Sequence, residues 1–134
     1  MSTAHKLFDN VFQDDSLNFW AGPGQSLDYE RVRDVVGLTN SDLSRVAHVA
    51  KNSVRFDERI PPALKERMEQ IANCSLMVAR YFNGDARKVS LWFGAPNPML
   101  GNVSPRDMIR YGRFLKLQRF ISGALTEVSR EPQS

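Results

Sequence analysis

Apolar residues recur at intervals of three and four through most of the chain, a spacing typical of helices. One such stripe runs through residues 29–36, and Gly37 can end that helix in a left-handed conformation. Thr39 predicts the start of a second helix, because Asp42 three positions later completes a capping box. The apolar face of this second helix consists of Leu43, Val46, Ala47 and Ala50. Residues 51–55 are predicted to form a third, short helix, and three short helices joined by tight turns indicate a helix-turn-helix.

The longest predicted helix spans residues 62–83 and begins at Pro61-Pro62. Proline is tolerated there because the N–H groups of a first helical turn have no intrahelical partners. Asn83-Gly84 is a typical C-terminal stop. The apolar stripe of this helix consists of Leu64, Met68, Ile71, Ser75, Val78 and Phe82. Its period alone assigns the stripe to a core.

The last third of the chain alternates helix starts with rigid turns. Asp85 is predicted to cap a helix over Ala86–Phe93, and a Gly- and Pro-rich turn follows at 94–98. Ser104-Pro105-Arg106-Asp107 combines a serine cap, a first-turn proline and an early carboxylate, which together indicate another helix start. Gly112 is expected to break or bend that helix. The final amphipathic helix carries Phe114, Leu117, Phe120, Ile121, Ala124, Leu125 and Val128, and Ser129–Ser134 is a polar tail.

No stretch of the sequence favours consecutive strands, so an all-α fold is expected. The weakly patterned residues 1–26 form an N-terminal extension, in which Leu7, Phe8, Val11 and Phe12 fit one face of a short helix and residues 21–26 form a linker. The predicted division is then a helix-turn-helix over 27–60, a connecting helix over 61–84 and a small helical domain over 85–134.

Composition narrows the class of protein without changing this outline. The 134 residues are 42% hydrophobic and 25% charged, which is ordinary for a globular protein. The net charge of +3 is uneven, with −2 over residues 1–27, zero over 28–60 and +5 over 61–134. The single cysteine, the absence of an N-terminal signal pattern and the lack of an apolar run of about 18 residues predict a cytoplasmic protein outside the membrane.

Catalytic chemistry is not predicted. Cys74 lies within the long predicted helix and is expected to be a core thiol. His5 and His48 are far apart in the chain, and no pair of cysteines or histidines has the spacing of a zinc site. We therefore expect no metal, no cofactor and no enzymatic activity.

Two motifs in the last third resemble the toxin-binding domain of the Xre/MbcA/ParS antitoxins. They are Leu91-Trp92-Phe93-Gly94-Ala95-Pro96-Asn97-Pro98-Met99-Leu100-Gly101 and Ser104-Pro105-Arg106-Asp107-Met108-Ile109. The tryptophan, the Pro-Asn turn, the Leu-Gly pair and the Pro-x-Asp helix start have that family's order and spacing. Residues 29–60 resemble its reduced Xre-type helix-turn-helix, although Phe56 stands where members often have tryptophan. The resemblance covers residues 27–127.

This resemblance implies an all-α antitoxin of a type II toxin–antitoxin system, commonly a homodimer. Its partner would be a RES- or ParT-like toxin that consumes NAD or transfers ADP-ribose, and the antitoxin would cover the active site of that toxin. Such a protein can also bind operator DNA and repress its own operon. The alternative function is a stand-alone helix-turn-helix regulator whose C-terminal part only dimerises, and an enzyme is a third, weaker possibility.

Candidate DNA contacts lie in and next to the predicted third helix. Asn can pair with adenine and Arg with guanine in the major groove, while other cations contact phosphates. The expected contacts are Arg45, Lys51, Asn52, Ser53 and Arg55. Because residues 28–60 are neutral overall, DNA binding is expected to be modest and sensitive to salt.

Candidate toxin contacts lie in residues 85–134. Arg106, Arg110, Arg113 and Lys116 would form one basic face if the helix continued through Gly112, and the alternative is an ordinary solvated face. Trp92 either seals the core or forms an apolar rim for a partner. Phe120 and Leu125 flank the main apolar stripe of the last helix, and Glu127 and Glu131 are expected to reach the toxin's nucleotide pocket.

Overall fold

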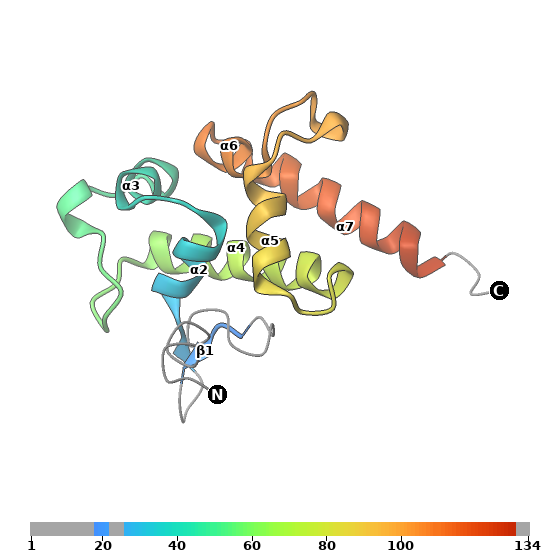
Figure 1. Ribbon diagram of the computed structural model, residues 1–134. Coiled ribbons are helices and arrows are strands. Elements are labelled where there is room, and N and C mark those ends of the chain that lie inside the picture. Colours follow the sequence, from blue (N-terminus) through green and yellow to red (C-terminus); the bar gives the residue numbers. More distant parts are fainter. Residues whose placement is uncertain (1–17, 22–25, 131–134) are drawn as a thin grey trace, which may run out of the picture.

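The computed structural model describes residues 18–21 and 26–130, and within these the predicted all-α fold is confirmed (Figure 1). The predicted helix around residues 7–12 and the end of the polar tail lie outside the described residues. The elements in chain order are β1 (Trp20–Ala21), β2 (Ser26–Leu27), α2 (Tyr29–Val36), α3 (Asn40–Ala47), the 3-10 turn η2 (Lys51–Ser53), α4 (Pro62–Tyr81), α5 (Ala86–Gly94), the 3-10 turn η3 (Pro98–Leu100), α6 (Pro105–Arg110) and α7 (Phe114–Arg130).

Local capping accounts for most of the helix boundaries. The side chains of Thr39 and Asp42 exchange hydrogen bonds with each other's backbone N–H groups, at 3.0 and 2.8 Å, and complete the predicted capping box. Asp85 caps α5, and Ser104 Oγ accepts from the Asp107 N–H at 3.0 Å to cap α6. Gly37 ends α2 with a φ of 85°, a left-handed conformation that side chains with a Cβ disfavour. These predicted starts and stops are confirmed.

The segment after α3 differs from the prediction. The helix ends at Ala47, and His48 adopts a left-handed conformation, so Ala50 lies outside the helix. Ser44 Oγ donates to the Val49 carbonyl at 2.6 Å, while the Val49 N–H donates back to the Ser44 carbonyl. This pair of bonds turns the chain away from the helix axis. The predicted third helix over 51–55 was therefore wrong, since only the three-residue turn η2 forms there.

The linker predicted at 21–26 is flanked by a minimal antiparallel ladder that the sequence pattern did not indicate. Trp20 pairs with Leu27 and Ala21 with Ser26 in the register of β1 and β2. The Asp28 N–H also donates to the carbonyl of Phe19, whose side chain is fully buried. The ladder thereby ties the first described residues to the core.

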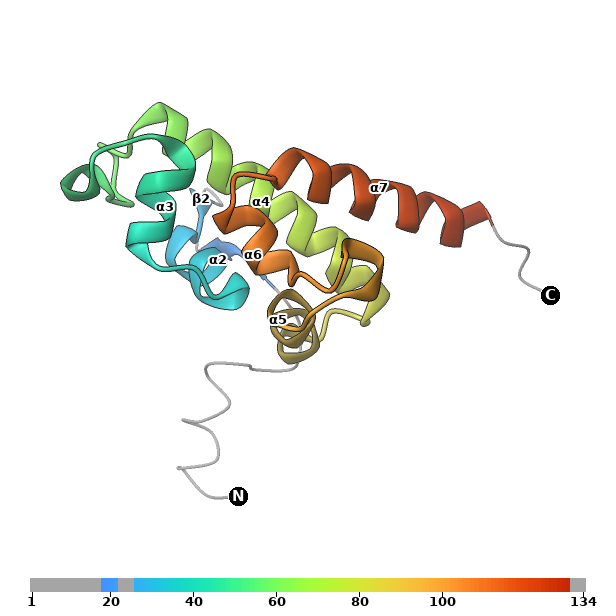
Figure 2. The same cartoon turned by 90° about the horizontal axis from the view of Figure 1, so that it is seen from above.

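One hydrophobic core runs through the segments predicted as separate parts. It extends from Phe19 to Ile121 and includes buried residues of every α-helix described. α4 contacts α2, α3, α5 and α7, while α2 packs on α5 and α3 packs on α6. α4 and α7 lie side by side, and the last turns of α7 extend beyond the rest of the molecule in both views (Figures 1 and 2).

Arg106 joins three helix ends within this core. Its Nε donates to the Val36 carbonyl at the C-terminus of α2, at 2.9 Å. A Cβ at Gly37 would lie 2.5 Å from the guanidinium of Arg106, and a Cβ at Gly94, the last residue of α5, would lie 2.8 Å from it. Both distances are shorter than van der Waals contact, so a Cβ at either position would force the Arg106 guanidinium to move.

The Arg106 contact predicts opposite effects for two helical glycines. Gly94→Ala should lower the free energy of unfolding by about 1 kcal/mol. The added Cβ would move the guanidinium and break its charged hydrogen bond, and the energy lost with that bond is larger than the energy gained from the higher helix propensity of alanine. Gly123→Ala in α7 is the matched control, since no atom lies within 4 Å of its added Cβ. It should stabilise the protein by about 0.5–1 kcal/mol.

Chemical denaturation of both variants tests this difference. In an Arg106→Ala background, Gly94→Ala should become neutral or stabilising, because the clashing group is gone. A Gly94→Ala cost that persists without Arg106 would contradict the assigned cause.

Candidate functional site

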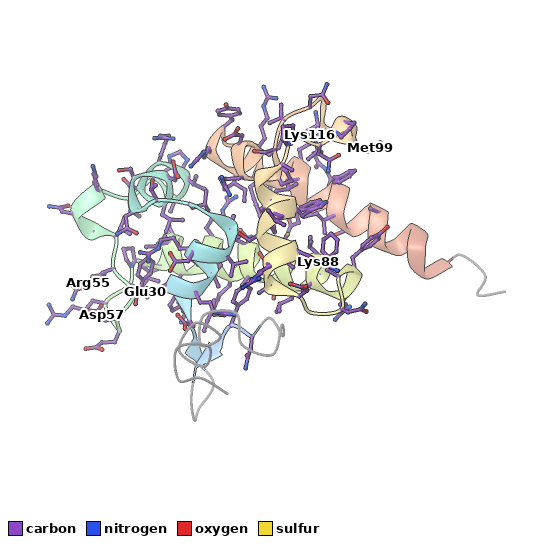
Figure 3. The ribbon with its side chains drawn as sticks, viewed as in Figure 1. Glu30, Arg55, Asp57, Lys88, Met99 and Lys116 are labelled. Carbon is purple, nitrogen blue, oxygen red and sulfur yellow. The ribbon has the colours of Figure 1, made fainter. Side chains whose placement is uncertain are left out.

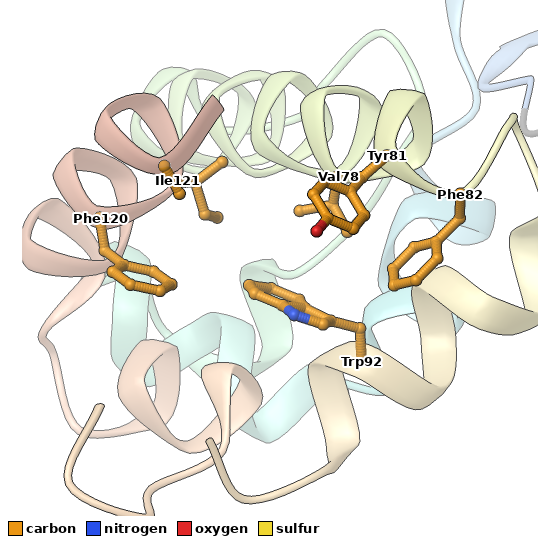
Figure 4. Close-up of a pocket in the computed structure, with 7 residues that line it drawn as sticks. Val78, Tyr81, Phe82, Trp92, Phe120 and Ile121 are labelled. Atoms are coloured by element: carbon orange, nitrogen blue, oxygen red, sulfur yellow. The ribbon is translucent and has the colours of Figure 1, made fainter. Parts of the chain in front are cut away.

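A pocket of about 210 Å³ opens on the surface between the end of α4, the middle of α5 and α7 (Figure 4). Trp92 from α5 faces the side chains from the other two helices across this space. The lining residues are Val78, Tyr81, Phe82, Trp92, Phe120, Ile121 and Ala124. Hydrocarbon and aromatic groups therefore dominate the site.

Each helix that lines the pocket contributes both buried core residues and more exposed aromatic residues. Val78 and Ile121 are buried and belong to the core, whereas Tyr81 is 62% exposed and Phe120 is partly buried. Trp92 is next to the fully buried Phe93, and their rings meet edge to face at 5.1 Å. The neighbour in the core holds the tryptophan in place while one side of its ring stays available.

The size of the pocket limits what it can bind. Sites for small molecules and cofactors commonly enclose about 300–1,000 Å³, which is more than this pocket offers. An apolar cavity of about 150 Å³ is already large enough to hold benzene. The pocket thus matches a single aromatic or large aliphatic side chain of a protein ligand.

The stretch of sequence that contributes the pocket residues is strongly basic. Within residues 76–124 the only acidic residues are Asp85, which caps α5, and Asp107, which pairs with Arg110. Lys88 lies one helical turn before Trp92, Lys116 lies one turn before Phe120, and both lysines are exposed (Figure 3). The basic residues of the segment are Arg80, Arg87, Lys88, Arg106, Arg110, Arg113, Lys116 and Arg119.

The structure brings together two of the residues predicted to contact a toxin. Trp92 and Phe120, 28 positions apart in the sequence, both line the pocket. Arg113 and Lys116 both follow Gly112 in the chain, and both are exposed. The side chains of Leu125 and Glu127 and the whole of Glu131 lie outside the described residues.

Arg106 and Arg110 do not share a face with Arg113 and Lys116. α6 ends at Arg110, and Gly112 turns the chain with a φ of 78° before α7 begins. Both arginines instead bind within the chain, Arg106 at the Val36 carbonyl and Arg110 at carboxylates. The basic face that required a continuous helix is therefore absent.

Arg110 joins α6 to α3 through a buried carboxylate. Its Nε lies 3.1 Å from Oδ2 of Asp42, which is only 6% exposed, and its Nη1 lies 3.1 Å from Asp107. Burial raises the pKa of Asp42, but hydrogen bonds from the Thr39 backbone and from Arg110 outweigh it and set the pKa below its usual value. The charged form of Asp42 is the one that the fold stabilises.

Arg55, one of the predicted DNA contacts, lies on the opposite side of the molecule from Met99 (Figure 3). Lys51 and Asn52 are exposed and Ser53 is half-buried, but all three occupy a single 3-10 turn. The Arg55 guanidinium forms a bidentate pair with Asp57 and holds the pKa of that carboxyl at about 2.

The remaining predicted contact, Arg45, lies 3.7 Å from the Asp42 carboxylate. Two of the three predicted cations thus already have acidic partners. The segment also lacks a helix of the length that enters a major groove.

Tyr81 and Phe82 are pocket residues that the sequence analysis did not identify as functional. Phe82 was predicted to belong to the core stripe of the long helix, and no role was predicted for Tyr81. Two adjacent aromatic residues at a helix end cannot both face one core, since neighbours on a helix point about 100° apart. That adjacency, just before the Asn83-Gly84 stop, was the available signal.

The remaining features that could indicate chemistry are the cysteine thiol, potential metal-binding side chains and membrane-spanning helices. Cys74 is buried, and burial raises the pKa of its thiol to about 11, which leaves it protonated and unreactive near neutral pH. Among residues 18–21 and 26–130, no group of three or more potential metal-binding side chains comes together. No helix in the same ranges is long and apolar enough to cross a membrane.

Comparisons of the chain with family models, with curated proteins and with solved structures found no match. The pocket and the charges of its neighbouring residues are therefore the features of this chain that point to a function.

The Asp42–Arg110 pair predicts a pH-dependent contribution to stability. Because the pKa of Asp42 is lower in the folded protein than its unfolded value of about 3.9, its contribution is complete above that value and is lost as the pH falls through the folded pKa. Asp42→Asn should therefore cost about 2 kcal/mol at pH 7 and much less at pH 2.

Urea unfolding at both pH values measures this change, with Asp34→Asn as the control. Asp34 is exposed and pairs only at the surface with Arg33, so its replacement should change the free energy of unfolding by less than about 0.5 kcal/mol. An equal cost of Asp42→Asn at the two pH values would show that the carboxylate charge is unimportant.

Proposed function

We propose that this protein is an antitoxin, a non-enzymatic partner that neutralises a RES- or ParT-like toxin through the pocket between α4, α5 and α7. The carrying observation is the apolar pocket rimmed by Tyr81, Trp92 and Phe120. It contains Trp92 of the motif that resembles the antitoxin toxin-binding domain. A site for a protein side chain thus coincides with the segment that suggested the function.

The physical character of the rim supports a protein ligand. Tyrosine and tryptophan combine a large apolar area with few rotatable bonds, and such residues dominate the binding energy of many interfaces. An exposed apolar cluster bordered by charges is typical of an interaction surface. The cations around the pocket would attract an acidic partner and increase mainly its rate of association.

The position of α7 supports inhibition by steric cover. Phe120 and Ala124 line the pocket, and the helix continues to Arg130, where its last turns extend beyond the body of the protein (Figure 2). A toxin side chain held in the pocket would place the toxin surface beside these turns. In this proposal the end of α7 covers the substrate entrance of the toxin.

The alternative of a stand-alone DNA-binding regulator has weaker support. The predicted reading element is the three-residue turn η2, and Arg55 is paired with Asp57. A helix-turn-helix protein needs a recognition helix that presents several free side chains to base edges. Autorepression of the operon stays a secondary part of the proposal and would require surfaces other than η2.

Two tyrosines of equal exposure provide a matched test of the pocket. Tyr81 lines the pocket and is 62% exposed, whereas Tyr111 lies outside it and is 64% exposed. Tyr81→Asp should weaken toxin binding by about 30-fold or more, because it removes an aromatic anchor and places a charge at an apolar rim. Tyr111→Asp should bind as the unchanged protein does.

The measurement is rescue of growth in cells that co-express each variant with the toxin encoded beside this protein, followed by pull-down of the purified pair. Thermal unfolding of both variants controls for loss of fold. Full protection by a folded Tyr81→Asp variant would rule out the pocket as the toxin contact.

A further inference from the structure

The chain contains a segment whose chemistry complements the pocket. Residues 1–17 lie outside the described residues, and their sequence carries Phe8 and Phe12 four positions apart, next to Leu7 and Val11. The acidic residues of the segment, Asp9, Asp14 and Asp15, exceed the single Lys6 and give it a net charge of −2. It therefore combines aromatic side chains with negative charge.

We propose that residues 1–17 bind the Tyr81–Trp92–Phe120 pocket of the same molecule and that a protein partner must displace them. The inserted group is a phenylalanine ring, Phe8 or Phe12. The docking itself does not depend on the identity of the partner. Only its regulatory consequence rests on the proposed antitoxin function.

The pocket suits this occupant in size and polarity. At about 210 Å³ it exceeds the roughly 150 Å³ that holds a benzene ring, so it has room for one phenyl group. The rings of Trp92 and Phe120 offer edge and face contacts of the kind that aromatic pairs favour. Insertion would also remove exposed apolar surface of Tyr81 from water.

Charge complementarity favours the same occupant. Lys88 and Lys116 stand one turn before Trp92 and Phe120, on the two helices that flank the pocket. The two carboxylates within residues 76–124 are already used by the α5 cap and by Arg110. The aspartates of the segment would therefore meet lysines, with no competing acidic side chain in this part of the described chain.

The tether is long enough for the contact. Phe19 is fully buried, and its carbonyl accepts from the Asp28 N–H, which fixes where the segment leaves the body. Phe12 precedes Phe19 by seven positions and Phe8 precedes it by eleven, which allows spans of up to about 25 Å and about 38 Å. A compact chain of this length has a radius of gyration of about 14 Å, so much of the surface is within reach.

Tethering makes a weak contact effective. A segment on a short linker experiences an effective local concentration in the millimolar range, so an affinity too weak for free peptides can fill the pocket. If the segment occupies the pocket nine-tenths of the time, a competing partner binds about 10-fold more weakly than it would without the segment. The segment would thus set the threshold for partner binding.

Photocrosslinking of the full chain tests the proposal without any toxin. Leu7 and Val11, which directly precede Phe8 and Phe12, are replaced, one at a time, by p-benzoylphenylalanine, so that both phenylalanine rings are kept. The purified protein is irradiated, and crosslinked peptides are mapped by mass spectrometry. We expect at least one probe to crosslink within a single chain to peptides that contain Tyr81, Trp92 or Phe120. The same crosslink should fall at least 5-fold in yield in a Tyr81→Asp background and persist in a Tyr111→Asp background.

Three results would overturn the proposal. They are the absence of crosslinks from both probes, crosslinks that map away from the pocket, and crosslinks found only between two chains on an electrophoresis gel. The last result would assign the segment to the pocket of a second copy. Because no toxin is present, these failures leave the proposed antitoxin function intact, while loss of toxin binding with intact crosslinking would remove only that function.

Discussion

The arrangement of the helices depends on one partly buried contact, that of the Arg106 guanidinium with the ends of α2 and α5. Its Nε bonds the Val36 carbonyl across 70 positions of sequence, at the C-terminus of α2 where the helix dipole favours a cation. A partly buried charge without partners would be costly, so the group can stay there only while these helix ends keep their positions. Gly37 and Gly94 provide the space in which it lies.

The pocket is a consequence of that arrangement. Gly94 ends the helix that carries Trp92. Arg106 lies in the first turn of α6, which leads through Gly112 into α7 and Phe120. The contact of Arg110 with Asp42 adds a second tie between α6 and the N-terminal half. Two walls of the pocket are thus positioned by polar contacts made outside it, which leaves the pocket itself free to be apolar.

The cations of the C-terminal half fall into two groups, those bound inside the molecule and those exposed at its surface. Arg106 and Arg110, two members of the predicted basic face, bind inside the molecule, while Arg113, Lys88 and Lys116 remain exposed. Such a surface suits a ligand that combines an apolar side chain with acidic neighbours, which is the composition of residues 1–17 and the character of the partner that we propose.

The sequence by itself determined most helix boundaries, because a cap is a contact between residues three positions apart. Thr39 with Asp42 and Ser104 with Asp107 could be read directly, and so could the stop at Gly37. The prediction from sequence was wrong after Ala47, where a hydrogen bond from Ser44 Oγ to the Val49 carbonyl turns the chain.

Tertiary structure alone decided the roles of surface-patterned residues. Helical spacing predicted that Arg106 and Arg110 share a face, but it could not show that the face points at Val36 and Asp42, some 70 positions away. Nor could it bring Tyr81 to Trp92 and Phe120. Such contacts depend on how whole helices pack, and packing is determined by shape and burial across the entire core rather than by any local pattern.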